Sequence, residues 1–353
     1  AAQNNLRKLG LLLGDYEITH KPQPGMPTND VQTLRSISAV AAAAFAPFIA
    51  SAQPSLLGLD DFNELGLGLN LQSTFRQPEY TSWNSMRDTE DSRFLGLVMP
   101  QILIRTPYTD DGRRQDRFIF RETVSEVKDY LWGNAIYAFG AVVTRSFCQY
   151  GWFANIRGST RGEVNGGLIT DLPVESYPTD KPSLVTKPAV ETLIGDRLEK
   201  ELNDVGLIPV SPCKDSRNMV FYTNSSLQQS AQYDTQVASV NARLSTMLQY
   251  MLCVSRFAHY MKVIARDKIG SFASADDCEK QLKDWLMEYA TANDDASLEA
   301  KAKHPLRDFK VEVREQPGKP GSYACITHLK PHFQLDQLVS SIRLVTELVT
   351  KRR

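Results

Sequence analysis

The last fifty residues of the chain constrain its fold most strongly, because two stretches rich in β-forming residues flank a run of proline and glycine. The first stretch carries apolar side chains at every second position, namely Phe309, Val311 and Val313. The second stretch includes Tyr323, Cys325, Ile326 and Leu329. Alternation with a period of two is typical of a strand with one buried face, and the intervening QPGKPG is typical of a turn. We therefore predict a β-hairpin over residues 309–329.

The residues after the hairpin follow a different period. Apolar side chains recur at steps of three and four, at Leu335, Leu338, Val339, Ile342, Val345, Leu348 and Val349. This spacing predicts an amphipathic helix over residues 335–350. The opposite side of that helix would carry polar residues, namely Asp336, Gln337, Ser341, Arg343 and Glu347.

The predicted hairpin needs a partner. A two-stranded hairpin is marginally stable by itself and leaves unpaired N–H and C=O groups on its outer edges. No later strand is predicted to cover them, since the residues that follow fit a helix. Two ways to complete the sheet remain open: an earlier strand of the same chain pairs with the hairpin, or a strand of another polypeptide adds to it.

A long helical pattern precedes the hairpin. Apolar residues over 237–265 step alternately by three and four, which predicts one helix of about thirty residues. Ser274, with Asp277 three residues later, resembles a capping box and opens a further helix. We therefore expect an α+β fold with mixed sheets and packed helices. It would comprise an α/β domain over residues 1–235 and a C-terminal domain over residues 236–353.

Charge is unevenly distributed along a chain that is close to neutral. The 353 residues carry a net charge of −1, and 42% of them are hydrophobic, as in an ordinary globular protein. Residues 301–353 carry +6, so the remainder carries −7. A basic end on an acidic body favours self-association or binding to an acidic partner surface.

The sequence favours a cytoplasmic protein without membrane insertion. Its five cysteines are scattered without CxxC pairs, which argues against a disulfide framework and for a reducing compartment. The most apolar run, residues 39–52, is too short and too polar for a membrane span. No signal peptide opens the sequence, and its first residues, Ala-Ala-Gln, lead us to expect a further N-terminal region ahead of them.

Few residues are candidates for catalysis. The sequence contains no GxSxG, HExxH or Walker motif. His20 lies in a loop rich in proline, and His259 lies within the long helical pattern, where a structural role is the better interpretation. Cys325 and His328 would point to opposite faces of a strand, and His332 lies beyond that strand, so we predict no metal site.

Two binding functions were weighed against structural interpretations. The Gly-rich segment 151–167 holds Arg157, Arg161 and Glu163, which could bind an anion in an enzyme or form a salt-bridged surface loop. Nucleic-acid binding would need exposed aromatic residues interleaved with the basic ones. The aromatic residues of the basic end lie on amphipathic elements, so packing explains them better, and we predict no nucleic-acid partner.

Four long runs together resemble one protein family. They are GWFANIRG at 151–158, NDVGLIPVSPCKD at 203–215, NARLSTMLQYMLCVSRFAHYMKVIARDKIGSF at 241–272 and PGKPGSYACITHLKPHFQLDQLVSSIRLVTEL at 317–348. In content and order they resemble the large subunit of the bacterial type VI secretion contractile sheath, the TssC/VipB family. Members of that family have a further region ahead of LLLGDYEITHKP, which this sequence lacks.

The resemblance implies a structural protein and not an enzyme, and it implies no cofactor. In that family, a heterodimer with a small sheath subunit (TssB/VipA type) stacks into helical rings around a tube of hexameric tube protein (Hcp type). The sheath assembles on a baseplate and contracts, and an AAA+ ATPase (ClpV type) disassembles it by acting through the small subunit.

Neighbouring protomers of such a sheath are tied by a "handshake" sheet of interleaved terminal strands. The resemblance places these inter-subunit strands at the terminal hairpin, and we predict that the polar side of the terminal helix faces the tube. A phage-tail or pyocin-type sheath, which works without a small subunit, is the alternative.

Overall fold

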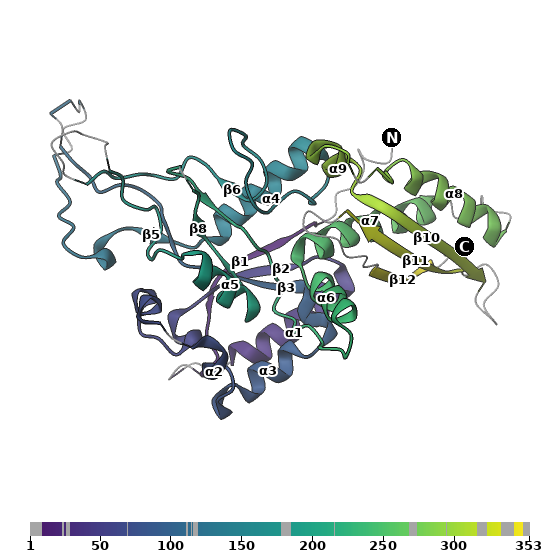
Figure 1. Cartoon of the computed structure of the whole chain (residues 1–353), viewed down its shortest axis with the longest axis horizontal. Helices are drawn as coiled ribbons and strands as arrows, with labels where there is room; N and C mark the ends of the chain where they lie inside the picture. The colour runs from purple at the N-terminus through teal and green to yellow at the C-terminus, as the bar shows by residue number, and fades with distance from the viewer. Residues whose placement is uncertain are drawn as a thin grey trace.

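The computed structural model describes the chain over residues 9–22, 25, 29–68, 70–110, 112–113, 115, 119–177, 185–214, 216–267, 274–293, 295–315, 323–332 and 342–348. Figure 1 shows a larger body and, at one end of it, a smaller part built from the last helices and strands. The described residues include no helix that is long and apolar enough to cross a membrane.

The body is built on a parallel sheet of four strands in the order β1-β2-β3-β7. Their bounds are β1 Leu12–Ile18, β2 Phe48–Ala52, β3 Leu95–Met99 and β7 Leu207–Pro209. β2 and β3 are short runs of apolar and small residues that are buried along their whole length. Such runs are typical of parallel strands, because helices cover both faces of a parallel sheet.

Helices cover both faces of this sheet. They are α1 (Asp30–Ala44), α3 (Thr81–Arg87) and α5 (Asp196–Asp204) on one face, and α4 (Ile136–Tyr150) on the other. Successive residues of β2 alternate between the two cores, since Phe48 and Ala50 belong to the first and Ile49 to the second. The strand therefore contributes to both hydrophobic layers.

Short elements complete the body. The strands β6 (Leu168–Ile169), β9 (Met219–Val220) and β8 (Ser211–Pro212) form a small antiparallel sheet, and β4 (Ile102–Leu103) pairs with β5 (Trp132–Gly133). Besides α2 (Leu71–Thr74), the short helical turns are η2 (Pro54–Leu57), η3 (Phe62–Leu67), η4 (Pro78–Tyr80), η5 (Glu90–Phe94) and η6 (Val127–Asp129).

The single helix predicted over 237–265 is wrong, because that region forms two helices, α6 (Gln236–Ser245) and α7 (Leu248–Asp267). The break has a backbone cause. The C=O of Thr246 accepts a hydrogen bond from the N–H of Ser226 at 2.9 Å, and the N–H of Leu248 donates to the C=O of Asn224 at 2.8 Å. Residues 224–226 thus form hydrogen bonds with backbone groups that a continuous helix would bond internally.

α7 contributes to two hydrophobic cores. Leu248 and Leu252 pack in the second core of the body, whereas Phe257 and Met261 pack against the C-terminal part. The predicted boundary after residue 235 would assign the whole helix to the C-terminal domain. That division stays a prediction, and the packing shows one helix shared by both parts.

The C-terminal part is an antiparallel sheet in the order β10-β11-β12, preceded by two helices. The elements are α8 (Ala275–Met287), α9 (Leu298–Lys303), β10 (Leu306–Glu315), β11 (Tyr323–Pro331) and β12 (Ile342–Leu348). In the β10–β11 pair, Phe309 lies opposite Leu329 and Val313 lies opposite Cys325. The hairpin predicted over 309–329 is therefore present. With these sheets and helices, the chain has the mixed composition that the α+β class predicts.

The terminal helix predicted over 335–350 is wrong for residues 342–348, which form β12. The sequence IRLVTEL fits both periods, because Ile342, Leu344 and Leu348 are spaced by even steps, whereas Ile342, Val345 and Leu348 belong to the helical pattern. Its β-branched residues favour a strand, and the free edge of β11 offers backbone partners that an isolated helix would lack.

This third strand also covers one edge of the predicted hairpin. The strand that pairs with the hairpin is a later strand of the same chain, so the prediction that no later strand covers its edges is wrong. Three residues assigned to the polar side of the terminal helix lie outside the described residues, namely Asp336, Gln337 and Ser341. The other two, Arg343 and Glu347, lie on β12.

Candidate assembly interface

One face of the C-terminal sheet is buried against α7 and α8. Val311, Cys325 and Leu329 belong to one core with these helices and are at most 1% exposed. On the side of α7, the ring of Phe257 stacks on that of Trp152, with 4.2 Å between the ring centroids. Burial of these large apolar side chains fixes the sheet to the helices, so this face is used within the chain.

The opposite face of β10 is charged. The carboxylate of Glu312 pairs with Lys310 Nζ at 2.6 Å and with Arg314 Nη2 at 3.0 Å. Lys310, and to a lesser extent Arg314, lowers the pKa of Glu312. Both cations are exposed. A sheet with one apolar and one charged face can meet solvent or a partner on the charged side.

The outer edge of β10 is partly occupied by the chain itself. At its start, the N–H of Leu306 donates to the C=O of Tyr289 at 3.1 Å. Further along, the N–H of Val313 donates to Glu279 Oε2 of α8 at 3.0 Å. The pKa of Glu279 is lowered, first by its hydrogen bond from Lys283 and then by the bond from Val313. A charged side chain on an edge amide is one way in which proteins prevent unwanted strand addition.

The direction of the Val313 N–H fixes the direction of the backbone groups in the regular part of this sheet, from Asp308 onward in β10. Along an antiparallel strand, successive residues direct their N–H and C=O groups to alternate sides. The backbone N–H of Val313 points away from β11. Cys325 lies opposite Val313 and therefore directs its own backbone groups toward β12. Cys325 in turn lies opposite Thr346, whose groups point back to β11. The backbone groups of the residues between then point outward.

The outer edge of β12 is therefore lined by the backbone N–H and C=O groups of Arg343, Val345 and Glu347. Among the described residues, β12 is paired on one side only. Two of these three residues were predicted to contact a tube through their side chains. Those side-chain contacts stay a prediction, and the backbone register places the residues at the open edge of the sheet, where a further strand can pair.

The seven residues predicted to pair between subunits pair within the chain in this structure. Phe309, Val311 and Val313 lie on β10, and Tyr323, Cys325, Ile326 and Leu329 lie on β11, the central strand. Both edges of β11 are thus occupied by strands of its own chain. Pairing between subunits through this sheet stays a prediction, and it would involve the outer edges of β10 or β12.

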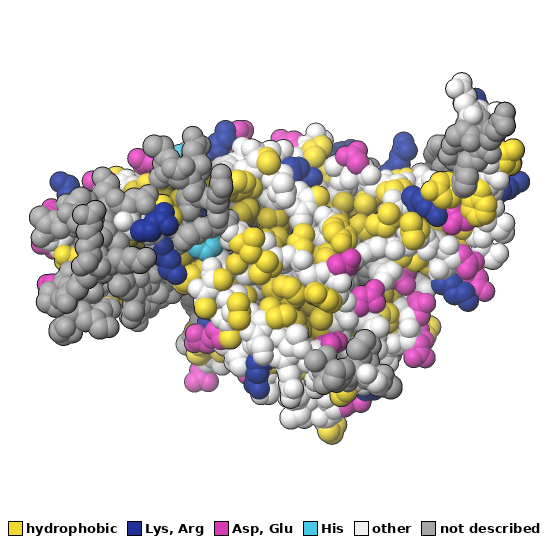
Figure 2. Space-filling view, turned by 180° about the vertical axis from the view of Figure 1, so that it is seen from behind, with side chains coloured by type: hydrophobic (Ala, Val, Ile, Leu, Met, Phe, Trp, Pro, Cys, Tyr) yellow, Lys and Arg dark blue, Asp and Glu magenta, His cyan; other side chains and the backbone are white. Residues whose placement is uncertain are grey.

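A further edge strand lies in the body. β1 is one of the two edge strands of the parallel sheet within the described part of the chain, and Leu13 and Tyr16 on it are 40% and 65% exposed. Figure 2 shows hydrophobic side chains gathered across the middle of the face seen from behind. Exposed apolar surface of this kind is typical of contact with another protein.

The structure places Cys325 and His259 in packed, buried surroundings. Among the described residues, no group of three His, Cys, Asp or Glu could hold a metal ion. Cys325 is buried, and burial raises the pKa of its thiol. His259 Nε2 lies 2.8 Å from the C=O of Ala44, which fits the structural role expected for it.

The Gly-rich segment 151–167 holds Arg157 and Glu163 in separate contacts. Arg157 is buried, and its Nη1 lies 3.9 Å from the sulfur of Met247. Glu163 instead accepts a hydrogen bond from Asn165 within the loop. Within the described part of the chain, no ion pair joins Glu163 to Arg157 or Arg161.

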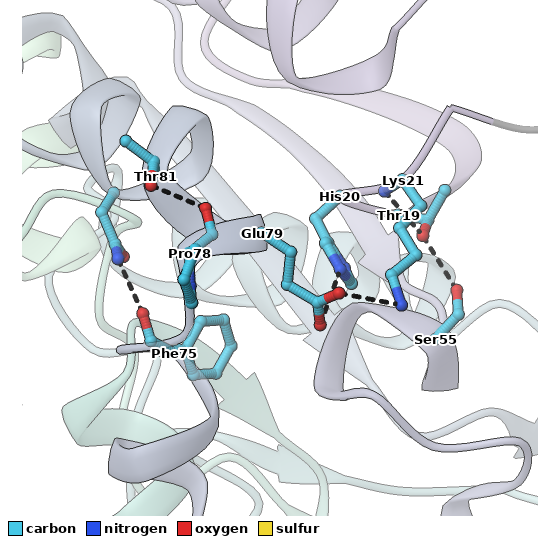
Figure 3. Close-up of polar contacts among 9 residues, drawn as sticks. Thr19, His20, Lys21, Ser55, Phe75, Pro78, Glu79 and Thr81 are labelled. Atoms are coloured by element: carbon cyan, nitrogen blue, oxygen red, sulfur yellow. Dashed lines mark hydrogen bonds and ion pairs between the residues drawn. The ribbon is translucent and has the colours of Figure 1, made fainter.

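His20 has a more specific environment than its sequence indicated. Figure 3 shows Glu79 directed toward His20, with the Thr19 and Ser55 hydroxyls joined beside them. The His20 ring stacks on Tyr80 with 4.0 Å between centroids, and Nε2 lies 3.6 Å from Glu79 Oε1. Burial lowers the pKa of His20 despite the nearby carboxylate. This cluster fastens the end of β1 to η2 and η4, so a structural role follows.

Glu279 is a functional candidate that the sequence analysis missed. It lies in the helix that the Ser274 capping signal predicted, where an acidic residue near the start of a helix needs no further explanation. Its contact with Val313 joins residues 34 positions apart, a proximity that no local pattern contains.

Comparisons with known proteins cover nearly the whole chain. A family model described as "EvpB/VC_A0108, tail sheath N-terminal domain" matches residues 7–228, and a second, "EvpB/VC_A0108, tail sheath gpW/gp25-like domain", matches residues 237–348. The type VI secretion system sheath protein TssC1 of Pseudomonas aeruginosa is 39% identical over 342 residues. That alignment covers 96% of this chain and 67% of the relative.

Proposed function

Because this chain belongs to the tail-sheath family of type VI secretion systems, as a homologue of the large sheath subunit, we propose that it is a building block of a contractile sheath. The observation that carries the proposal is the similarity to TssC1 over 96% of the chain, which includes both the body and the C-terminal sheet. The sheath would surround an inner tube and propel it by contracting.

The partners follow from this role. The chain would form a heterodimer with a small sheath subunit and contact neighbouring protomers, a hexameric tube protein and a baseplate. An AAA+ ATPase would disassemble the contracted sheath through the small subunit. The basic charge of residues 301–353 against the acidic remainder supports contacts in which the C-terminal part of one protomer meets the body of another.

The C-terminal sheet is the proposed link between protomers. Its helix-covered face holds it to its own body through α7, while the outward N–H and C=O groups of Arg343, Val345 and Glu347 can pair with a strand of a neighbour. Main-chain pairing holds while the bodies rotate as rigid units, so the link would persist through contraction. Tube contacts of Arg343 and Glu347 stay a separate prediction, to be tested by reversing both charges and measuring binding to the tube.

Co-expression with the small subunit tests this function. Electron microscopy should show hollow helical tubes that contain both subunits, and purification should recover a heterodimer from disassembled material. A chain that forms tubes alone would instead support the phage-tail or pyocin-type alternative. A chain that stays monomeric beside a soluble small subunit would contradict the sheath role.

A further inference from the structure

A polar cavity lies in the body, away from the C-terminal sheet. Its volume is about 590 Å³, within the range of roughly 300–1,000 Å³ typical of ligand sites. Its wall is formed by α2 and α3, the end of α5 with Gly206, the segment 225–232 and the end of α6. The cavity therefore lies next to the break between α6 and α7.

Arg87 is the unusual residue of this wall. It is only 5% exposed, and its guanidinium makes one hydrogen bond, from Nε to the C=O of Leu227 at 2.8 Å. Within the described part of the chain, its two terminal nitrogens have no hydrogen-bond or ion-pair partner. Burial lowers its pKa to about 10, only partly offset by Asp88. Asp88 also lines the cavity but forms no ion pair with Arg87 in the described part of the chain, so an anionic ligand would give the buried guanidinium a direct partner.

The surrounding backbone holds Arg87 in place. The N–H of Gln229 donates to the Arg87 C=O at 2.9 Å, so the segment that accepts from the side chain also binds the main chain of the same residue. Gly206 lies against the guanidinium: a Cβ there would lie 3.1 Å from Arg87 Nη2, and its φ of +87° favours glycine. The donor group is thus positioned before any ligand binds.

The rest of the cavity favours a peptide over a small ion. Arg76 and Arg243 lie on its rim as further cations, and Arg243 pairs with Asp204 at 2.7 Å. Amide side chains that can bond a main chain line the remainder, namely Gln72, Asn84, Asn203, Gln228, Gln229 and Gln232. A lone phosphate would leave most of this space unfilled, whereas several residues of extended chain fit it.

We propose that this cavity binds an acidic peptide segment of another protein, with a carboxylate on the terminal nitrogens of Arg87. The inference rests on the cavity alone and does not depend on the sheath function. Arg76 would contribute electrostatic attraction from the rim, and the amide side chains would bind the peptide main chain.

The test measures binding of a hexaglutamate peptide to the purified full chain by calorimetry, with hexaglutamine and inorganic phosphate as comparison probes. Arg87→Gln should weaken hexaglutamate binding about tenfold or more, since a charged hydrogen bond is lost, and Arg76→Gln should weaken it by about threefold. Arg197→Gln is the matched control, because it removes an exposed arginine of α5 that lies outside the site of Arg87.

The proposal is supported if hexaglutamate binding is saturable and hexaglutamine binding is weak. Arg87→Gln should then weaken hexaglutamate binding most, Arg76→Gln less and Arg197→Gln least. Absence of hexaglutamate binding overturns it, as does binding that Arg197→Gln reduces as much as Arg76→Gln does. Binding of phosphate alone overturns the peptide assignment. Should Arg87→Gln fail to fold, the contrast between Arg76→Gln and Arg197→Gln decides the outcome.

Discussion

The two main sheets of the molecule differ in how much of their surface the chain itself covers. The parallel body sheet has helices on both faces, and its central strands are buried along their length. The antiparallel C-terminal sheet has helices on one face, a charged opposite face and an open edge at β12. The first arrangement suits a rigid body, and the second leaves backbone groups available to another chain.

α7 connects these two regions. Loss of its most buried aromatic side chain, Phe257, gives the largest effect we predict. Phe257 is fully buried among Trp152, Trp285 and Tyr289. Phe257→Ala should lower the free energy of unfolding by about 3–5 kcal/mol, through lost burial and a cavity. Thermal unfolding should remain one transition, because α7 belongs to both cores. Tyr233→Ala, at an exposed aromatic, should change stability by less than about 0.5 kcal/mol.

Separate melting of the two regions in the Phe257→Ala variant would break this part of the comparison. It would mean that the C-terminal sheet unfolds independently of the body, and that the link through α7 carries no cooperativity.

Proline substitutions in β12 distinguish the role of the edge that faces β11 from the role of the outer edge. Leu344 directs its N–H to β11, so Leu344→Pro should cost about 1 kcal/mol or more in subunit stability. Val345 directs its N–H outward, so Val345→Pro should spare that ladder bond and abolish sheath assembly. Denaturant titration of the heterodimer and electron microscopy of co-expressed subunits measure the two effects. Full-length sheaths with Val345→Pro would remove the proposed role of this edge.

The side chain of Glu279 should protect the other edge of the same sheet. Glu279→Ala frees the N–H of Val313, so we expect a loss of about 1 kcal/mol and increased self-association of the isolated subunit, seen by light scattering. Glu299→Ala is the control, since Glu299 makes the same type of pair with Lys303 but contacts no strand amide in the described chain. Equal effects of both variants would show that the lost ion pair within the helix, and not the lost contact with Val313, causes the change.

The smallest effect concerns pH and the body. Because burial lowers the His20 pKa, the unfolded chain binds a proton more readily than the folded one below the ordinary value of about 6.5. Stability should therefore fall as pH falls from about 6.5 toward the folded pKa. His20→Asn should reduce this decline, measured as thermal unfolding between pH 7 and 5. A decline of the same steepness in the variant would show that other groups cause it.

Local patterns predicted those elements whose cause is local. The hairpin follows from alternation around a proline and glycine turn, and the capping signal at Ser274 is present, with its Oγ accepting from the Asp277 N–H at 3.2 Å. The break between α6 and α7 was missed because the apolar steps continue through Thr246, while the backbone bonds that break the helix come from residues 224–226.

The candidate sites depend on contacts that are distant in sequence. IRLVTEL fits the period of a helix and that of a strand, and its pairing with the free edge of β11 decides between them. The residues that line the cavity around Arg87 range from Gln72 to Thr246 in the sequence, so no local spacing predicts it. The family was evident from long runs, whereas the direction of each backbone group required the structure.

The most direct test of the proposed link is residue-level amide hydrogen exchange of β12 in the free heterodimer and in the assembled sheath. Amides of Leu344 and Thr346, which face β11, should be protected in both states. Amides of Arg343, Val345 and Glu347 should exchange quickly in the heterodimer and at least about tenfold more slowly in the sheath. Equal rates in both states for these three amides would contradict strand pairing at this edge.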